Sequence, residues 1–456
     1  MQPYYLGGDV SKGYADFVIM NKEETIEESE FQLDDTRQGH QRLEQILNAF
    51  FIRHPDALLY AAVESTGGYE NNWFNTLRNL SLKYHLYAAR INPKGISHDS
   101  KASMARTITD KISARHIAAY QIHHPKNVQY NVDDPYHALR RAYTTLGIQI
   151  KTKTQMINEL ETCLYEANPE IMIYRKSGFS KWLLHLLQSY PDAASLAQAS
   201  VDELVKIPFV AVTKAKAIIA RAKESVASIS DEMVASSIKR LARTILYLDE
   251  EIDQELNELQ KKLLIPQIKL LQTFRGIGLQ SALGLFIEMG AIERFPTVKN
   301  LASYFGLHPV YKQSGDGTWG MHMSKQGRKK ARVILYMVAV NAINHNPLIR
   351  AVYQRARNKG KTKKAALGVC MHKILRIVYG MLKHNQPFDE SIDRHNQTKA
   401  VERKKTKKPD ASRRYQSEDQ SAPISYRQTQ KRKERERSQS ENVTMHEISV
   451  PAPSGV

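Results

Sequence analysis

YYLGGDVSKGYADFVIM, residues 4–20, is the stretch that decides the fold of the amino-terminal part of this chain. Two segments rich in Tyr, Val, Ile and Phe flank a turn that contains Lys12 and Gly13, which is typical of a β-hairpin. Residues 38–52 then carry apolar side chains at helical spacing. Residues 57–63 form a short apolar run, which predicts a buried strand that ends at Glu64.

Helix and strand continue to alternate beyond this point. A helix is predicted near residues 71–80, a strand near 84–91 and a helix over 108–120, and Asn92-Pro93 is expected to stop the strand. Strands first, followed by alternating helix and strand, predict a mixed α/β domain over about residues 1–130.

Two long helical segments follow, and each carries apolar residues at alternating spacings of three and four. That spacing is typical of a coiled-coil seam, within one chain or between chains, and the alternative is two amphipathic helices packed on their own domain. Lys153 and Glu255 interrupt the two seams. The seam residues are Leu139, Tyr143, Leu146, Ile150, Ile157, Leu160 and Leu164, and then Ile238, Leu241, Ile245, Leu248, Ile252, Leu259 and Leu263.

Two further stretches have the pattern of helices around a turn. Between the long helices, residues 170–230 contain DELVKIPFVAVTKAKAIIARA, which resembles a helix-hairpin-helix without its usual glycines and fits a plain helical insert equally well. In residues 271–289, the glycines Gly276 and Gly278 interrupt the chain just before a helix. Glycines there would let the backbone approach a phosphate closely.

The predicted organisation has four parts. They are a mixed α/β domain at 1–130, coiled-coil helices with a helical insert near 170–230 at 136–265, a basic, mostly helical domain with a helix-hairpin-helix-like element at 266–390, and a disordered tail at 391–456.

The charge of the chain points to a polyanionic partner. The 456 residues carry a formal net charge of +19, and from Gly317 to Phe388 there are 15 Lys and Arg and no acidic residue. A surface of this kind suits phosphates, because each contact releases a condensed counterion. No apolar run approaches the roughly 20 residues of a membrane span, so no membrane partner is expected, and two distant cysteines fit a reducing cytoplasm.

Three carboxylates stand where strands and helices begin or end. Asp9 follows two glycines at the end of the first strand, Glu64 ends another strand, and Asp110 begins a helix. Strand ends from distant positions meet at one edge of a mixed sheet, and three carboxylates gathered there would repel one another without a cation. Mg²⁺, or Mn²⁺ in its place, is the natural choice for a site that acts on phosphates. Taken singly, each acid fits a surface or capping role equally well.

Seven motifs in order resemble the DEDD transposases of insertion sequences. GGDVSK at 7–12, VESTGGY at 63–69, INP at 91–93 and TDKISAR at 109–115 resemble their RuvC/RNase H-like domain. RGIG at 275–278, with LASYFGLHPVYKQSGDGTWG at 301–320 and MSKQGRKKAR at 323–332, is similar to their serine-bearing transposase domain. The resemblance covers roughly residues 4–388, and the family includes pilin-gene invertases and recombinases guided by a bridge RNA.

The resemblance assigns roles to particular residues. It implies that Asp9, Glu64 and Asp110 are three of the four metal-binding acids and that Ser314 is the nucleophile that attacks DNA. Without the resemblance, Ser314 would be an ordinary serine in a polar loop. The basic and glycine-containing motifs supply the expected nucleic-acid contacts, which are Lys12, Gly276, Gly278, Ser324, Lys325, Arg328, Lys329 and Lys330.

One position departs from the family pattern. The fourth acid comes three residues after the third, one helical turn on, and here that residue is Ser113. Three acids and water could suffice, another acid such as Asp16 or Asp99 could substitute, or metal binding could be weakened.

The resemblance implies a cytoplasmic, nucleoid-associated homo-oligomer, a dimer or tetramer, in a bacterium or archaeon. Its partners would be DNA and, if the chain is of the guided kind, a structured RNA. Two other interpretations stay open: a RuvC-like junction nuclease that needs no serine, and a protein that only binds nucleic acid.

Overall fold

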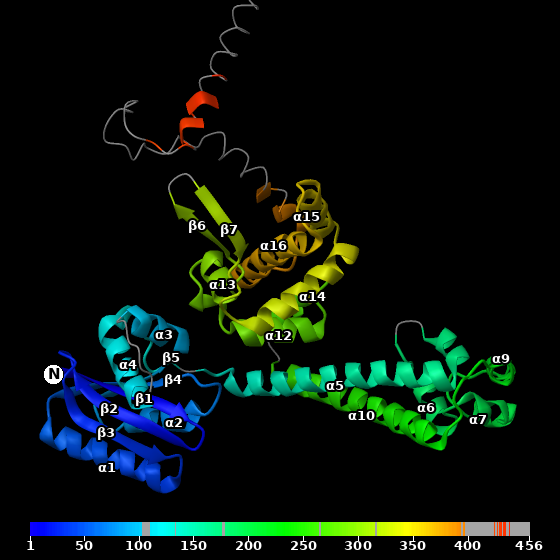
Figure 1. Cartoon of the computed structure of the whole chain (residues 1–456), viewed down its shortest axis with the longest axis horizontal. Helices are drawn as coiled ribbons and strands as arrows, with labels where there is room; N and C mark the ends of the chain where they lie inside the picture. Colours follow the sequence, from blue (N-terminus) through cyan, green and yellow to red (C-terminus); the bar gives the residue numbers. More distant parts are fainter. Residues whose placement is uncertain are drawn as a thin grey trace, which may run out of the picture. The chain divides into compact units, whose positions relative to one another are not determined.

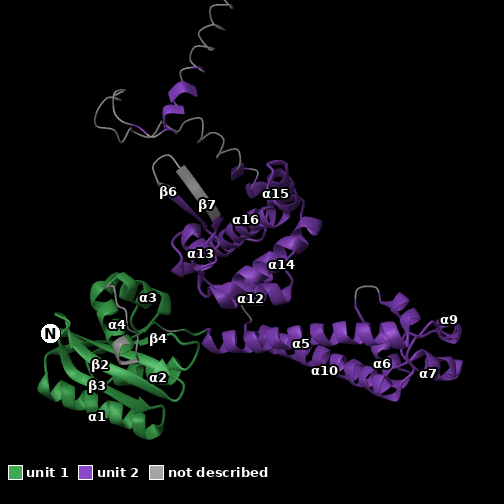
Figure 2. Ribbon diagram, in the orientation of Figure 1, with its two compact units in different colours: residues 1–135 green, residues 136–456 purple. Residues whose placement is uncertain are grey.

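The computed structural model describes residues 1–102, 110–132, 134–175, 178–263, 266–314, 317–393 and 395–396, together with a few residues between 424 and 437. Within these ranges the side chains of 110–112 and 313–321 are outside the description. The chain divides into two compact units, Met1–Pro135 and Tyr136–Val456 (Figure 2). Most of the tail predicted to be disordered, 391–456, lies outside the described residues.

The first unit is built on a five-stranded mixed sheet in the order β3-β2-β1-β4-β5 (Figure 1). β1 pairs antiparallel with β2 and parallel with β4, while β3 pairs antiparallel with β2 and β5 pairs parallel with β4. The predicted hairpin and the mixed α/β sheet are therefore confirmed. The strands are β1 (Gln2–Ser11), β2 (Tyr14–Asn21), β3 (Ile26–Asp34), β4 (Ala57–Glu64) and β5 (Leu86–Ile91).

Helices cover both faces of this sheet. α1 (Arg37–Arg53) and α2 (Glu70–Leu80) pack on one face, where Leu47 and Trp73 join Leu6 in one buried cluster. α3 (Pro93–Ala102) and α4 (Asp110–His123) lie on the other, through clusters that contain Ile96, Ile117 and Ala114.

The second unit opens with two long helices that pack along each other. They are α5 (His137–Ala167) and α10 (Glu232–Lys262). Leu146 of α5 shares a buried cluster with Leu259 of α10, while Leu164 shares another with Ile238, so the helices run antiparallel. Lys153, which interrupts the first seam, forms an ion pair with Asp249 of α10. Much of the apolar seam is thus buried inside one chain, which agrees with the within-chain form of the predicted seam.

Short helices connect the two long ones and form a buried cluster of their own with them. The insert is helical, as predicted. Its elements are η2 (Pro169–Tyr174), α6 (Lys181–Ser189), α7 (Ala193–Ala197), α8 (Val201–Val205) and α9 (Val212–Lys223).

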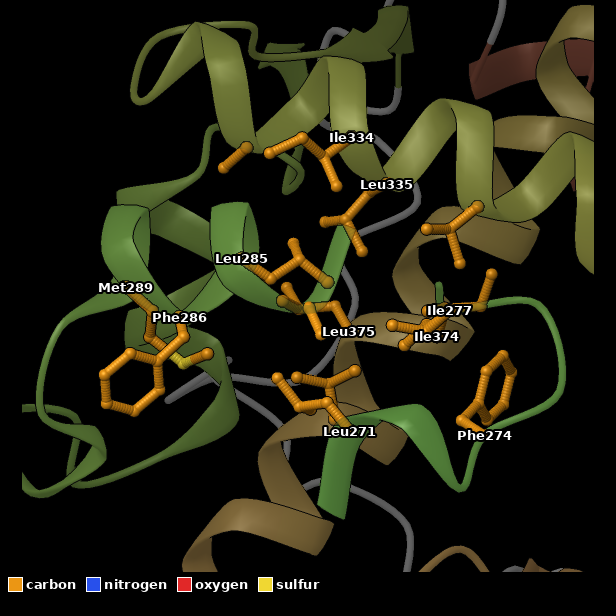
Figure 3. Close-up of a cluster of buried hydrophobic side chains, with 14 of the residues drawn as sticks. Leu271, Phe274, Ile277, Leu285, Phe286, Met289, Ile334, Leu335, Ile374 and Leu375 are labelled. Carbon is orange, nitrogen blue, oxygen red and sulfur yellow. The ribbon is translucent and has the colours of Figure 1, made fainter. Parts of the chain in front are cut away.

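The rest of the second unit surrounds one large apolar core. Leu285 and Phe286 of α12, Leu335 of α14 and Leu375 of α16 meet there (Figure 3). The elements are α11 (Pro266–Gln272), α12 (Leu279–Met289), η3 (Ile292–Arg294), α13 (Val298–Tyr304), β6 (Pro309–Ser314), β7 (Gly317–Met323), α14 (Lys329–His345), α15 (Pro347–Asn358) and α16 (Lys363–His384). The largely helical carboxy-terminal region is confirmed, whereas the β6–β7 hairpin was not foreseen.

Helix α16 is, within the described ranges, the one helix long and apolar enough to cross a membrane by length and composition. Half of its most apolar window is buried. Cys370, Ile374 and Val378 lie in the core shared with α14, which is the behaviour of a core helix.

Candidate functional site

Asp9 and Glu64 occupy equivalent positions at the ends of neighbouring parallel strands. The register of β1 and β4 pairs Gly7 with Ala62 and Gly8 with Val63, so the next residue on each strand is one of these two acids. Residues at the same level on adjacent strands point to the same face of a sheet. Two carboxylates that are 55 positions apart in the sequence therefore lie at one edge and on one face.

The face that carries these acids is the one covered by α4. Leu6 of β1 points into the core under α1 and α2, so the odd-numbered residues of β1 point the other way. At Gly7 an added Cβ would lie 2.0 Å from the carbonyl oxygen of Ala114 in α4. Ala62 of β4 packs against Ile117 of the same helix, which places Glu64 on this face as well.

The direction of α4 brings its first residue to the same edge. Its last residue, His123, contacts Glu24 in the β2–β3 connection, with Nε2 and Oε1 2.7 Å apart. That connection lies at the edge where β1 begins. The start of α4, with Asp110, therefore lies at the opposite edge, where β1 and β4 end. The side chain of Asp110 is outside the described residues.

Carboxylate oxygens at this edge fit a hard divalent cation such as Mg²⁺ or Mn²⁺. The side chains that the structure describes, which exclude Asp110, contain no group of three His, Cys, Asp or Glu placed to hold a metal ion. The candidate donors are thus on one edge and face rather than gathered at one point.

Burial affects Glu64 in particular. Partial removal from water raises the pKa of its carboxyl above the ordinary glutamate value, because the charged form loses hydration. A cation at this edge would favour the charged form and oppose that shift.

A further acid, Asp16, lies directly across from Asp9. The register of β1 and β2 pairs the two residues, and Asp16 is only 3% exposed. The side-chain amide of Gln32 in β3 donates to both Asp16 oxygens, at 3.2 and 3.1 Å. The sequence analysis gave Asp16 as one acid that could substitute for the fourth ligand. It could not locate Asp16 relative to Asp9, because that requires the register of the strands.

Asp99, the other possible substitute, lies at the wrong edge. It is in α3, and its two oxygens are 3.2 Å from His123 Nδ1 and 2.8 Å from His124 Nε2, at the far end of α4. Ser113, by contrast, lies in the first turn of α4 and is half-buried. Lys12 is exposed in the β1–β2 turn, at the same edge as Asp9.

Ser314 is the last residue of β6, and it pairs with Gly317 at the start of β7. It therefore sits at the tip of a β-hairpin rather than in the polar loop that its neighbours suggested. Residues 315–316 between the strands, and the side chain of Ser314 itself, are outside the described residues.

The basic loop that follows β7 is held by its own backbone. The amides of Ser324, Lys325 and Arg328 donate to the carbonyl oxygens of His308, Gly306 and Tyr304, at 2.9, 3.0 and 3.1 Å. These amides are therefore already used, and phosphate contacts from this loop would come from side chains.

The basic residues predicted to contact nucleic acid differ in the interactions that they already make within the protein. Lys325 has φ 56° and is exposed, as is Lys329. The Arg328 Nε donates to the Tyr304 hydroxyl at 2.9 Å, and its guanidinium lies 3.7 Å from the buried Glu288. The Lys330 ammonium donates to Thr144.

The two glycines before α12 have different surroundings. Gly276 has φ 120°, and an added Cβ would lie 2.9 Å from the Ala342 side chain of α14, so close packing accounts for it. At Gly278, which precedes the first residue of α12, an added Cβ meets nothing within 4 Å. Of these two glycines, only Gly278 thus leaves open space for the phosphate backbone of a nucleic acid.

Two family profiles match the chain in order. A profile of DEDD transposases of the IS110 type, described as "Transposase", matches residues 6–169. A second, described as "Transposase IS116/IS110/IS902 family", matches residues 268–354. The first match contains Asp9, Glu64 and Asp110, and the second contains Ser314.

Individual relatives agree with the profiles. The "Pilin gene-inverting protein" of Moraxella bovis is 34% identical over 163 residues, which cover 34% of this chain and 48% of that protein. The "Insertion element IS116 uncharacterized 44.8 kDa protein" of Streptomyces clavuligerus is 23% identical over 246 residues, 52% of this chain and 62% of that protein. The chain thus spans about half the length of the first relative.

The acids at the sheet edge and the serine hairpin both lie inside the matched segments. This chain belongs to the IS110/IS116/IS902 family of transposases and carries the family's DEDD amino-terminal domain.

Proposed function

We propose that the protein cuts and rejoins DNA as the transposase of an insertion sequence, with Ser314 as nucleophile and Asp9, Glu64 and Asp110 as metal ligands. The observation that carries the metal part is the shared register of Asp9 and Glu64 under the start of α4. Two carboxylates on one edge and face supply oxygen atoms of the kind that a divalent cation binds, and the family is defined by such acids.

Ser314 would form a covalent link to DNA. Its Oγ forms a bond to a backbone phosphorus while the bond from that phosphorus to a deoxyribose oxygen breaks. The hydroxyl proton passes to the departing oxygen, and the reverse transfer rejoins the strand. A metal at the carboxylates would supply positive charge to the phosphate when bound.

The basic segment would hold the nucleic acid. Residues 317–388 contain 15 Lys and Arg and no acid, and the exposed Lys325 and Lys329 belong to it. Such contacts carry no sequence information, so they fit DNA and a structured guide RNA alike. The pilin gene-inverting relative favours DNA inversion or transposition as the outcome. Guidance by RNA is a further part of the proposal that the assay below includes.

We also propose that the active form is a homo-oligomer, a dimer or a tetramer. Because α5 and α10 bury their seams on each other, the contact between subunits would use other surfaces than this seam.

The test is a cleavage assay with Mg²⁺ on DNA from the element's own junction, with and without RNA transcribed from its flanking non-coding region. Wild type, Ser314→Ala and the exposed-serine control Ser236→Ala are compared on a denaturing gel. A protein–DNA adduct is expected for wild type and for the control, and it should vanish in Ser314→Ala.

Other outcomes point to the alternatives. Cleavage without an adduct that persists in Ser314→Ala would indicate a metal-dependent junction nuclease. Binding without cleavage in Mg²⁺ or Mn²⁺ would indicate a protein that only binds nucleic acid. An adduct that needs the RNA would establish guidance.

A further inference from the structure

We propose that the loop between β4 and α2, residues 65–69, is a subsite for one unpaired base of the DNA strand, which stacks on the ring of Tyr69. The inference rests on the proposed function, because the 65–69 loop lies at the sheet edge that carries Asp9 and Glu64. It concerns how the strand is held at that edge, and it does not depend on a metal ion.

The 65–69 loop follows Glu64 directly, where β4 ends. Its first residue, Ser65, continues the pairing with β5, since its amide donates to the Ile91 carbonyl oxygen at 3.0 Å. The chain then leaves the sheet for α2, which begins at Glu70. In α/β sheets, ligands bind outside the carboxyl ends of the parallel strands. The 65–69 loop belongs to that region of the first unit.

Glu70 holds the loop in one conformation. This residue is 6% exposed, and its Oε2 accepts from the Thr66 amide and hydroxyl, each at 3.2 Å, and from the Gly68 amide at 2.7 Å. The Gly68 carbonyl oxygen accepts from the side-chain amide of Asn71 at 2.8 Å. Both polar backbone groups of Gly68 are therefore fixed by the first turn of α2, and Tyr69 stands between two residues that are held.

The same contacts argue against a phosphate site in this loop. A glycine-containing loop before a helix often binds phosphate through its backbone amides. Here the amides of Thr66 and Gly68 already donate to Glu70, so they are not available to a phosphate. What the loop offers to a nucleic acid is a side chain, and its one aromatic side chain is that of Tyr69.

Tyr69 presents an open ring on this fixed backbone. It is 52% exposed, and within the described residues it makes no side-chain hydrogen bond and no contact with another aromatic ring. Gly67 has φ 87°, and an added Cβ there would meet nothing within 4 Å, so the loop leaves open space two positions before the ring.

These properties suit an unpaired base. Proteins hold such bases by stacking them on aromatic side chains, and this contact tolerates different sequences because every base has a π-face. A side chain whose backbone is already ordered loses less conformational entropy on binding. Bases inside a duplex are covered on both faces by their neighbours, so the base on Tyr69 would be one that has left the stack.

The experiment measures binding of the full-length protein to DNA from the element's own junction, in a chelator so that no strand is cut. Tyr69→Ala should weaken binding by about 5- to 150-fold, the range that stacking of one base provides. Tyr69→Phe should bind like wild type, because the ring and not the hydroxyl makes the contact. Tyr165→Ala, which removes a tyrosine that is 70% exposed on α5, is the matched control and should change nothing.

An abasic site, moved through the DNA strand one nucleotide at a time, identifies the base. In wild type, one abasic position should weaken binding by a factor similar to that of Tyr69→Ala. In Tyr69→Ala the same abasic site should cause no further loss. A ring that merely supports the fold would give losses that add at every position, and that result would overturn the proposal, as would a Tyr69→Ala protein that binds like wild type.

The cleavage assay on the same DNA separates this proposal from the proposed function. If wild type forms the adduct and Ser314→Ala does not, while Tyr69→Ala leaves DNA binding unchanged, only the stacking role of Tyr69 is wrong. If Tyr69→Ala removes the base-dependent part of binding but wild type forms no adduct, the stacking subsite stands and the serine mechanism is wrong.

Discussion

Glu64 is a carboxyl group that the fold holds partly out of water, at the end of β4. Its raised pKa means that the folded protein keeps the proton to a higher pH than the unfolded chain does. The folded state then binds more protons in that interval, so metal-free stability falls as the pH rises above the ordinary glutamate value of about 4.3.

This gives a prediction for Glu64→Gln. In the presence of a chelator, the variant should be more stable than wild type at neutral pH, and the difference should shrink as the pH falls toward 4.3. Urea unfolding across this pH range measures it, with Glu258→Gln as the control for loss of one exposed charge. With Mg²⁺ the wild type should gain stability and the variant should not. If the stability difference between Glu64→Gln and wild type grew toward acid pH, the raised pKa of Glu64 would be contradicted.

At the same scale, the sequence identified Asp9, Glu64 and Asp110 by motif, and the structure puts the first two in register at one edge and face. It could not find the relation between Asp9 and Asp16. The two are seven positions apart in the sequence, and only the two-residue turn at Lys12-Gly13 makes them opposite partners. The sequence also could not show that Gly276 and Gly278 have different roles. The contact with Ala342 that explains Gly276 comes from a helix 66 positions away.

At the scale of elements, the contact between α4 and β1 positions the start of that helix. At Gly7 an added Cβ would lie 2.0 Å from the Ala114 carbonyl oxygen and 2.7 Å from the Ala118 nitrogen. Both obstacles are backbone atoms, so a side chain can be accommodated only if the helix moves away from the sheet.

We therefore expect Gly7→Ala to destabilise the protein by about 1–3 kcal/mol, as overpacking does, and to weaken Mn²⁺ binding because Asp110 moves with its helix. Gly147→Ala is the control. That glycine is exposed in α5 with nothing within 4 Å of an added Cβ, so the change should stabilise by about 0.5–1 kcal/mol. Denaturant unfolding and calorimetry test both. If Gly7→Ala had the stability and Mn²⁺ affinity of wild type, the contact between β1 and α4 at Gly7 would not be rigid.

The elements that sequence patterns missed share a physical reason. β3 reads IEESEFQLD and has no fully buried residue, so the strand lacks the apolar alternation that signals one. The strand before Asn92-Pro93 ends at Ile91, as predicted, but the helix α3 that begins at Pro93 was not predicted, although proline is favoured in the first turn of a helix. The β6–β7 hairpin is polar and short. The long helices were found because their seams repeat over many turns.

At the scale of the whole molecule, positive charge is concentrated in one stretch of the chain. The formal net charge of +19 includes a contribution of 15 Lys and Arg from 317–388, where no acid offsets them. The affinity for DNA should fall steeply with salt, since phosphate contacts release counterions.

Lys325 allows this to be measured one contact at a time. Lys325→Ala should reduce the slope of log affinity against log salt by about one, and should weaken all DNA sequences equally. Lys239→Ala, an exposed lysine on α10, is the control and should leave the slope unchanged. A sequence-dependent effect of Lys325→Ala would mean that the side chain reads bases.

The antiparallel pairing of α5 and α10 determines where this protein can accept insertions and deletions during evolution. Because α10 returns along α5, the end of α10 packs near the beginning of α5, with Leu259 and Tyr143 in one cluster. Residues 168–231 form an excursion that leaves and rejoins the chain at one end of the pair. Segments can be gained, lost or exchanged at that end while the other end keeps its packing. This hairpin is therefore the natural place for one lineage to lengthen its protein, and for an engineer to graft a new module.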